Sequence, residues 1–213
     1  DLHPRVRRQR QMCIRDRIAT GQFEEIQKVM PKSSYALLAD ELRRGHYVLD
    51  LSKFQKEIIY NLRKMKVGDI AQLADVSEGL ENAIKNAANS CNNVVDFVNI
   101  VKCKRYTQTR IQRILIYALL GITSEKMMTS KKTTPYARIL GFNEKGKKLI
   151  SQIVKHNKRA QIVTSVKKYM DESKNKALKE MLETDIFATN VYTLGYESDS
   201  WSNLDYTNKI ITM

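Results

Sequence analysis

The segment from Lys104 to Ile122 carries the strongest helix signal in the chain. Thr107 and Thr109 are both suitable N-cap residues, and Gln112 follows Thr109 at the spacing of a capping box. Beyond them the apolar residues recur every three or four positions, as on one face of a helix: Ile111, Ile114, Leu115, Ala118 and Ile122. We therefore predict a helix that starts at Thr107 or Thr109 and buries this apolar stripe in a core.

The start of this predicted helix is rich in groups that donate hydrogen bonds. Lys104 and Arg105 precede the helix, while Arg110 and Arg113 lie on a face away from the apolar stripe. Together with the backbone N–H groups of the first turn, such side chains suit phosphate oxygens. The candidate RNA-binding residues here are Lys104, Arg105, Tyr106, Thr107, Arg110 and Arg113. The alternative is a solvated helix end whose arginines pair with carboxylates, and few acidic residues lie nearby in the sequence.

The positive charge of the chain is concentrated in one region. Residues 102–168 contain seventeen basic and two acidic residues, whereas the whole chain carries a net charge of +14. A local excess of this kind attracts a polyanion, and we predict nucleic acid as the partner. An anionic membrane surface is the alternative, but it usually requires an aromatic border on a basic helix, and the single Trp201 lies in the acidic tail.

Cysteine usage and hydropathy favour a cytoplasmic protein. The three cysteines, Cys13, Cys91 and Cys103, have no paired spacing, so neither a disulfide framework nor a metal site is predicted. The longest uncharged apolar run is Ile114–Ile122, far shorter than the roughly 20 residues that span a bilayer. We therefore expect no membrane partner.

A second candidate phosphate site lies near residues 141–148. Gly141 and Gly146 flank a predicted helix start, which can bind phosphate with the help of Lys145, Lys147 and Lys148. An ordinary tight turn is an equally good interpretation. Arg138, in the extended segment before these glycines, completes the candidate RNA-binding set. No catalytic residues are predicted, because the chain lacks a glycine-rich phosphate loop, a paired-histidine motif and a Ser-His-Asp signature.

The spacing of apolar residues predicts a mainly α fold with one or two short strands. Helices are expected over about 20–30, 33–44, 50–67, 77–88, 92–101, 107–122, 143–156 and 173–188, with extended segments at 136–142 and 161–164. Residues 123–135 have no apolar period and are expected to form a flexible basic loop. These elements suggest a helical domain over 18–122, a basic loop with a small α/β or helical extension over 123–200, and a tail over 201–213.

The first seventeen residues, DLHPRVRRQRQMCIRDR, have no apolar period and contain six arginines. They resemble read-through of a sequencing adapter, and the alternative is a disordered basic arm that binds nucleic acid. We leave them out of the fold prediction.

Three strings resemble a known family when taken in order and at their spacings: VSEGLENAI (76–84), KCKRYTQTRIQRIL (102–115) and PYARILGFNEKGKKL (135–149). They are similar to the carboxy-terminal half of the tRNA(Met) cytidine acetate ligase family, over roughly residues 18–200. In that family a Rossmann-like amino-terminal domain with a His-x-Gly-His signature activates acetate with ATP. The acetyl group then passes to the N4 amine of the wobble cytidine of elongator tRNA(Met).

This chain contains no His-x-Gly-His signature. The resemblance therefore implies a mainly helical carboxy-terminal half, detached from a missing Rossmann-like α/β nucleotidyltransferase domain. Its expected function is to bind the anticodon region of tRNA, with ATP and acetate bound mainly by the missing domain. No cofactor is expected in this chain, and the chain alone is expected to be inactive. The alternatives are a stand-alone RNA-binding module without enzymatic activity, or a helical domain that docks an acidic protein.

Overall fold

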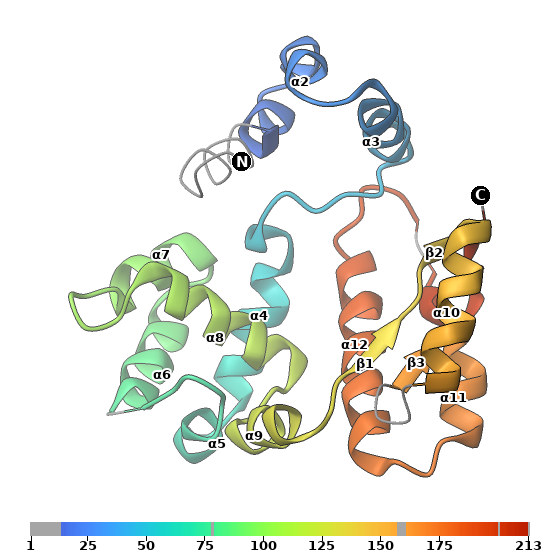
Figure 1. Ribbon diagram of the computed structural model, residues 1–213. Helices are drawn as coiled ribbons and strands as arrows, with labels where there is room; N and C mark the ends of the chain where they lie inside the picture. The colour runs from blue at the N-terminus through green and yellow to red at the C-terminus, as the bar shows by residue number, and fades with distance from the viewer. Residues whose placement is uncertain (1–13, 78, 157–160, 200, 213) are drawn as a thin grey trace.

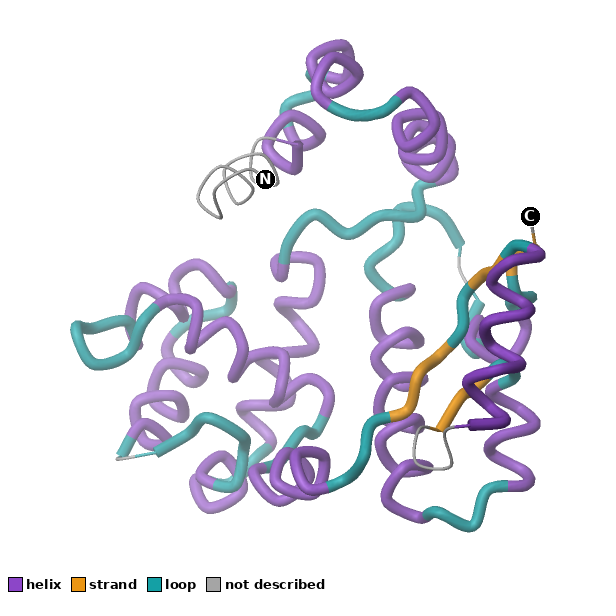
Figure 2. Tube along the Cα trace, viewed as in Figure 1, coloured by secondary structure: helices purple, strands orange, loops and turns teal. Residues whose placement is uncertain are grey.

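The computed structural model describes residues 14–77, 79–156, 161–199 and 201–212, and these residues form a mostly helical structure with two small sheets (Figures 1 and 2). Residues 14–19 are helical, while the rest of the basic opening, residues 1–13, lies outside the described residues. Among the described residues, none of the helices combines the length and the apolar character that a membrane span needs.

The main hydrophobic core lies in a bundle of helices from the first half of the chain. These are η1 (Leu51–Phe54), α4 (Gln55–Lys64), α5 (Val67–Ala71), α6 (Leu80–Ser90), α7 (Val94–Val101) and α8 (Gln108–Leu120). Phe97 is the largest of the fully buried side chains in this core, which also contains Ile58 and Leu62 of α4 and Leu80 of α6. The bundle supports α8, the helix that the sequence predicted most strongly.

Helix α8 forms as its sequence indicates. The side chain of Thr107 accepts a hydrogen bond from the backbone N–H of Arg110 at 3.4 Å, so Thr107 is the N-cap. Ile111, Ile114, Leu115 and Ala118 are buried in the main core. Gly121 ends the helix in the left-handed conformation, with φ of 64°. The predicted apolar stripe is therefore confirmed for these four residues, whereas Ile122 lies beyond the end of the helix and is half-buried. The stripe fixes which face of α8 points outward.

A second, smaller core is built around a parallel strand pair. Strand β1 (Tyr136–Arg138) pairs with β3 (Gln161–Val163), and β2 (Gly141–Phe142) pairs in parallel with β4 (Ile211–Thr212). Three helices and one short helical turn accompany these strands: α10 (Glu144–His156), α11 (Val166–Glu172), α12 (Lys176–Thr193) and α13 (Leu204–Thr207). The core consists of Val163, Val166, Leu182 and Ile186, with Tyr136 packed against it.

Helix α12 contacts both cores. Leu182 and Ile186 lie in the smaller core, whereas Val191, near the carboxyl end of the helix, packs against the main core. Just after the helix, the backbone of Gly195 approaches Phe54 so closely that a Cβ atom there would lie 2.7 Å from the phenylalanine ring. Figure 1 shows α12 between the main bundle and the strands. The helix therefore joins the two halves of the chain.

Helices α2 (Phe23–Val29) and α3 (Lys32–Arg44) follow the helical residues 14–19 and lie apart from the main bundle at the top of Figure 1. Helix α2 buries Ile26, while α3 has no buried residue. Residues 46–50 connect α3 to η1 without forming a helix, and Asp50 then caps η1 by accepting a hydrogen bond from the N–H of Ser52.

The prediction of a flexible loop at residues 123–135 is wrong, because α9 (Ser124–Lys132) forms there. The Thr123 side chain accepts a hydrogen bond from the N–H of Lys126 at 3.2 Å, which is an N-cap that the sequence analysis missed. The N–H of Ser124 also donates to the carbonyl of Gln72 at 2.8 Å, so a contact distant in sequence holds the helix start. A weak apolar period was insufficient to reveal this helix.

Candidate nucleic-acid interface

The first group of candidate residues lies at the amino end of α8, where residues 104–106 form a bend before the helix. Tyr106 is half-buried and packs against the main core. The guanidinium carbons of Arg105 and Arg110 lie 6.0 and 5.4 Å from the centre of its ring, within cation–π range. Lys104 and Arg105 are exposed. We call the four residues Lys104, Arg105, Tyr106 and Thr107 the α8 start.

The two arginines on the next turn of α8 bind the loop that follows α5. Arg110 donates from Nε and Nη2 to the carbonyl oxygen of Asp75, at 3.0 and 2.8 Å, and from Nη2 to Oγ of Ser77 at 2.8 Å. Arg113 donates from Nε and Nη2 to Oδ2 of Asp75, at 3.0 and 2.8 Å. The hydrogen bonds and the charge of Asp75 raise the pKa of Arg113.

Few acidic residues lie near these arginines in the sequence, yet Arg113 binds the carboxylate of Asp75, while Arg110 binds the backbone carbonyl of the same residue. Asp75 lies 38 residues before Arg113, so a search of the neighbouring sequence could not find the pair. Asp75 has a φ of 64°, in the left-handed region that residues other than glycine seldom adopt. Arg110 and Arg113 therefore hold an unusual backbone turn beside the α8 start.

The second group of candidate residues lies on α10. Asn143 accepts a hydrogen bond from the N–H of Gly146 at 2.9 Å, as expected of an N-cap. Lys145, Lys147 and Lys148 are exposed on the first two turns. Figure 1 places α10 on the far side of α12 from α8. The structure therefore places the two groups of candidate residues on separate surfaces.

Arg138 belongs to neither surface. Its Nη2 donates to Oδ1 of Asp205 at 2.5 Å, and the side chains of Arg138 and Asp205 are 26% and 9% exposed. Asp205 lies 67 residues further along the chain, in a tail to which the sequence analysis assigned no structure. The pair lines a pocket beside the strands.

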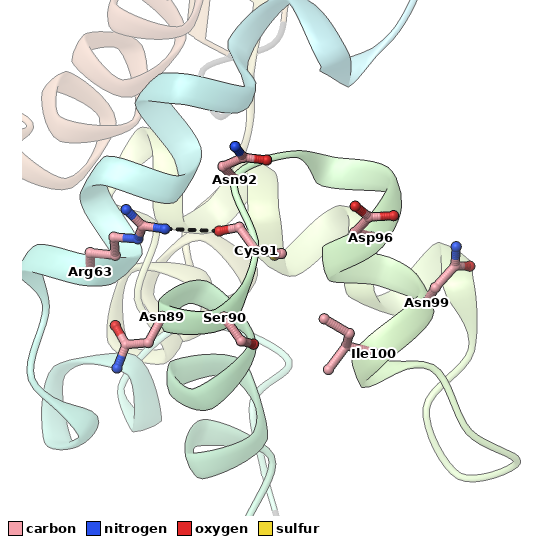
Figure 3. A pocket seen from close by; sticks show the side chains of 8 residues that line it. All are labelled: Arg63, Asn89, Ser90, Cys91, Asn92, Asp96, Asn99 and Ile100. Atoms are coloured by element: carbon pink, nitrogen blue, oxygen red, sulfur yellow. Dashed lines mark hydrogen bonds between the residues drawn. The ribbon is translucent and has the colours of Figure 1, made fainter.

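A polar pocket of about 600 Å³ lies between the end of α6 and the start of α7 (Figure 3). Asn89 and Ser90 lie on α6, and Asp96 and Asn99 on α7. The guanidinium of Arg63 donates to the carbonyl oxygens of Ala88 and Cys91, at 2.7 and 3.0 Å. These carbonyls belong to the last turn of α6 and its C-cap, so Arg63 stabilises the helix end.

Burial raises the pKa of the Cys91 thiol in the same pocket. A thiol of this kind is a poor nucleophile at neutral pH. The pocket is therefore best explained as part of the helix packing.

The comparisons with known proteins agree on one family. The family model of the HIGH Nucleotidyl Transferase matches residues 11–206. The tRNA(Met) cytidine acetate ligase of Thermoanaerobacter pseudethanolicus is 37% identical over 201 residues, which cover 94% of this chain and 48% of that protein. The enzyme of the same name from Acetivibrio thermocellus is 39% identical over 190 residues, covering 86% of this chain and 45% of that protein. The chain thus spans about half the length of the curated relatives it matches.

Two solved structures are similar in fold. The crystal structure of Thermotoga maritima TmcAL bound with alpha-thio ATP superimposes with a TM-score of 0.87 and 26% identity, over 95% of this chain and 51% of that chain. The apo form of the same protein gives a TM-score of 0.86 at 25% identity, over 94% of this chain and 50% of that chain.

These findings correct three predictions. The predicted fold class was a carboxy-terminal part detached from a missing nucleotidyltransferase domain, and the predicted function was tRNA binding by that part. Both are contradicted, because the nucleotidyltransferase family model matches this chain itself over residues 11–206. The expectation that no cofactor belongs to this chain is contradicted by the same match and by the structure solved with alpha-thio ATP. The error came from using one short signature as the test, whereas the family match extends over most of the chain. The chain belongs to the HIGH Nucleotidyl Transferase family.

Proposed function

We propose that this chain acts in an ATP-dependent ligase that joins acetate to a cytidine of tRNA(Met). The observation that carries the proposal is that the sequence comparison and the fold comparison point to the same enzyme. Relatives 37% and 39% identical are named for this reaction, and the solved structure of TmcAL covers 95% of the chain. A stand-alone binding module has no comparable support.

ATP is the expected nucleotide substrate. The Thermotoga maritima protein was solved with alpha-thio ATP, and a nucleotidyl transferase family activates its substrates by transferring a nucleotide to them. Acetate carries a poor leaving group, so its carboxylate must first displace pyrophosphate from ATP before an amine can attack the acyl carbon. Equilibrium binding of alpha-thio ATP to the purified protein tests the first of these steps.

The RNA substrate is expected to contact the exposed cations of both basic surfaces. Arg105 lies beside the ring of Tyr106, and Lys104 is exposed next to it in the sequence, so phosphates and an unstacked base of the anticodon region can be bound together at the α8 start. Thr107 holds the helix start, and Arg110 and Arg113 hold the adjacent turn at Asp75. Lys145, Lys147 and Lys148 supply a second set of phosphate contacts on α10.

The decisive experiment measures the product. The purified protein is incubated with ATP, acetate and tRNA(Met), and the nucleosides are then analysed by mass spectrometry for acetylated cytidine. A tRNA(Met) whose wobble cytidine is replaced by uridine is the matched control. Acetylation of tRNA(Met), without acetylation of the uridine variant, supports the proposal.

Acetate-dependent release of pyrophosphate from ATP is measured in the same reaction, because the sequence predicted that this chain alone would be inactive. Release of pyrophosphate shows that the chain carries the activating site. If the protein binds neither alpha-thio ATP nor tRNA(Met), the proposed function is wrong.

A further inference from the structure

A second pocket, of about 860 Å³, lies beside the two parallel strand pairs. Its walls come from the residues that follow β1, from Thr164 to Val166 after β3, and from residues 205–211 of the tail. The pocket therefore sits at the carboxyl ends of β1 and β3. Ligands of α/β proteins bind at this edge of parallel strands, because the loops there present side chains and backbone groups to a common space.

One side of the pocket carries the Arg138–Asp205 ion pair. Oδ1 of Asp205 accepts from Arg138, whereas Oδ2 is buried and accepts no hydrogen bond within the described residues. A buried carboxylate oxygen without a donor is costly, so a ligand that brings an N–H group to it gains affinity. The neighbouring guanidinium has further N–H groups, which suit an acceptor on the same ligand.

The remaining walls suit a flat ring. Leu140, Val163 and Val166 supply apolar surface, and Tyr206 supplies an aromatic ring that is 40% exposed. Lys209 is exposed at the pocket and can bind a phosphate attached to the ring. The pocket therefore has the features of a nucleotide site. It combines a hydrogen-bond acceptor next to donors with apolar walls, an aromatic ring and a nearby cation.

We propose that this pocket binds an unstacked RNA base that carries an exocyclic amino group, with cytosine as the matching pyrimidine. The amino group donates to Oδ2 of Asp205, and the adjacent ring nitrogen or carbonyl accepts from Arg138. Cytosine offers this donor next to acceptors, whereas uracil has a carbonyl oxygen in place of the amine and would meet the carboxylate unfavourably. The inference rests on the proposed function, since it requires RNA to be a substrate of this protein.

The test compares two labelled RNA octamers, one of cytidine and one of uridine, by fluorescence anisotropy. The protein is expected to bind the cytidine octamer roughly 5- to 100-fold more tightly, the range that one well-made base contact provides. In Asp205→Asn the side-chain oxygen still accepts from Arg138, so the amide NH₂ takes the place of Oδ2. This NH₂ is a donor and cannot accept a hydrogen bond from the amino group of cytosine. The preference for cytidine should therefore disappear in Asp205→Asn or reverse.

Asp171→Asn is the matched control, because Asp171 is exposed on α11 and does not line the pocket. It should keep the preference for cytidine, and thermal unfolding of both variants should show that Asp205→Asn remains folded. An unfolded Asp205→Asn would be replaced by Tyr206→Ala, which should weaken cytidine binding without affecting the ion pair. ATP is added in a separate competition.

Equal binding of the two octamers by the unmodified protein, or an unchanged preference in the folded Asp205→Asn variant, overturns the inference. Displacement of the cytidine octamer by ATP would assign the pocket to a free nucleotide and also overturn it. Binding of tRNA(Met) is measured in parallel. Normal tRNA binding with equal octamer binding refutes the pocket alone, whereas loss of all RNA binding refutes the proposed function as well.

Discussion

Arg110 shows how a residue predicted to contact RNA can be occupied by the protein itself. Its guanidinium donates three hydrogen bonds to Asp75 and Ser77, and its carbon Cζ lies 5.4 Å from the centre of the Tyr106 ring. These contacts connect α8 with the loop after α5. An RNA phosphate could use Arg110 only by sharing or breaking them, so its first role is to position the α8 start.

Arg110→Gln should therefore reduce stability, by about 1–2 kcal/mol, because three hydrogen bonds from a charged donor near the surface are lost or weakened. Chemical denaturation followed by circular dichroism measures the change. Lys104→Gln is the control, since Lys104 is exposed and its loss should leave the unfolding midpoint within error. A fully stable Arg110→Gln variant would show that the turn at Asp75 holds without the arginine.

Arg63 offers a second test at the same scale. Its side chain stabilises the end of α6 through the carbonyl of Ala88 and through that of Cys91, the second of which Figure 3 shows. Arg63→Met keeps the apolar stem of the side chain and removes the donors, so we expect a loss of about 1–3 kcal/mol in the free energy of unfolding. Hydrogen exchange of the α6 amides should increase first near Ser90. Uniform protection along α6 would contradict this role.

At the scale of elements, the junction between α12 and the main core leaves no room for a side chain at Gly195. A Cβ atom on Gly195 would lie 2.7 Å from Phe54 and 2.8 Å from Val48, closer than real Cβ contacts. Gly195→Ala should therefore destabilise the protein by about 1–3 kcal/mol through overpacking. The measurement is the midpoint of thermal unfolding.

Gly68→Ala is the matched control for this prediction. Gly68 lies in α5, and a Cβ atom there would have no heavy atom within 4 Å. Alanine in a helix is favoured over glycine by roughly 0.5–1 kcal/mol, so Gly68→Ala should be neutral or stabilising. Equal effects of the two substitutions would show that the close contact at Gly195 relaxes without cost.

The same elements show what the sequence could and could not predict. Helix α8 was predicted well, because its N-cap and apolar stripe are local features. The contacts made by Asp75 and Asp205 were missed, because each joins residues more than 30 positions apart. Helix α9 was missed because it buries no residue, so its apolar period is weak. In these cases the stabilising contacts come from residues distant in the sequence, so the neighbouring residues carry no pattern from which they could be predicted.

At the scale of the whole molecule, the exposed candidate cations lie on two surfaces. The α8 start belongs to the main bundle, whereas Lys145, Lys147 and Lys148 lie on α10, on the other side of α12 (Figure 1). A small anion can contact only one of these surfaces at a time. A folded tRNA is large enough to contact both, and the salt dependence of binding distinguishes the two cases.

Each phosphate contact to single-stranded RNA contributes about 0.7 to the slope of log affinity against log salt. The triple variant with Gln at Lys145, Lys147 and Lys148 should therefore flatten the slope for tRNA(Met) by roughly 2, and the double variant with Gln at Lys104 and Arg105 by roughly 1.4. If one RNA contacts both surfaces, the slope of the combined variant should be flatter by roughly 3.5, because independent contacts add. If its slope is instead no flatter than that of the triple variant, RNA binds at α10 alone. If its slope is no flatter than that of the double variant, RNA binds at the α8 start alone. Lys28→Gln on α2, whose cation is paired with Glu25, is the control for a general effect of net charge.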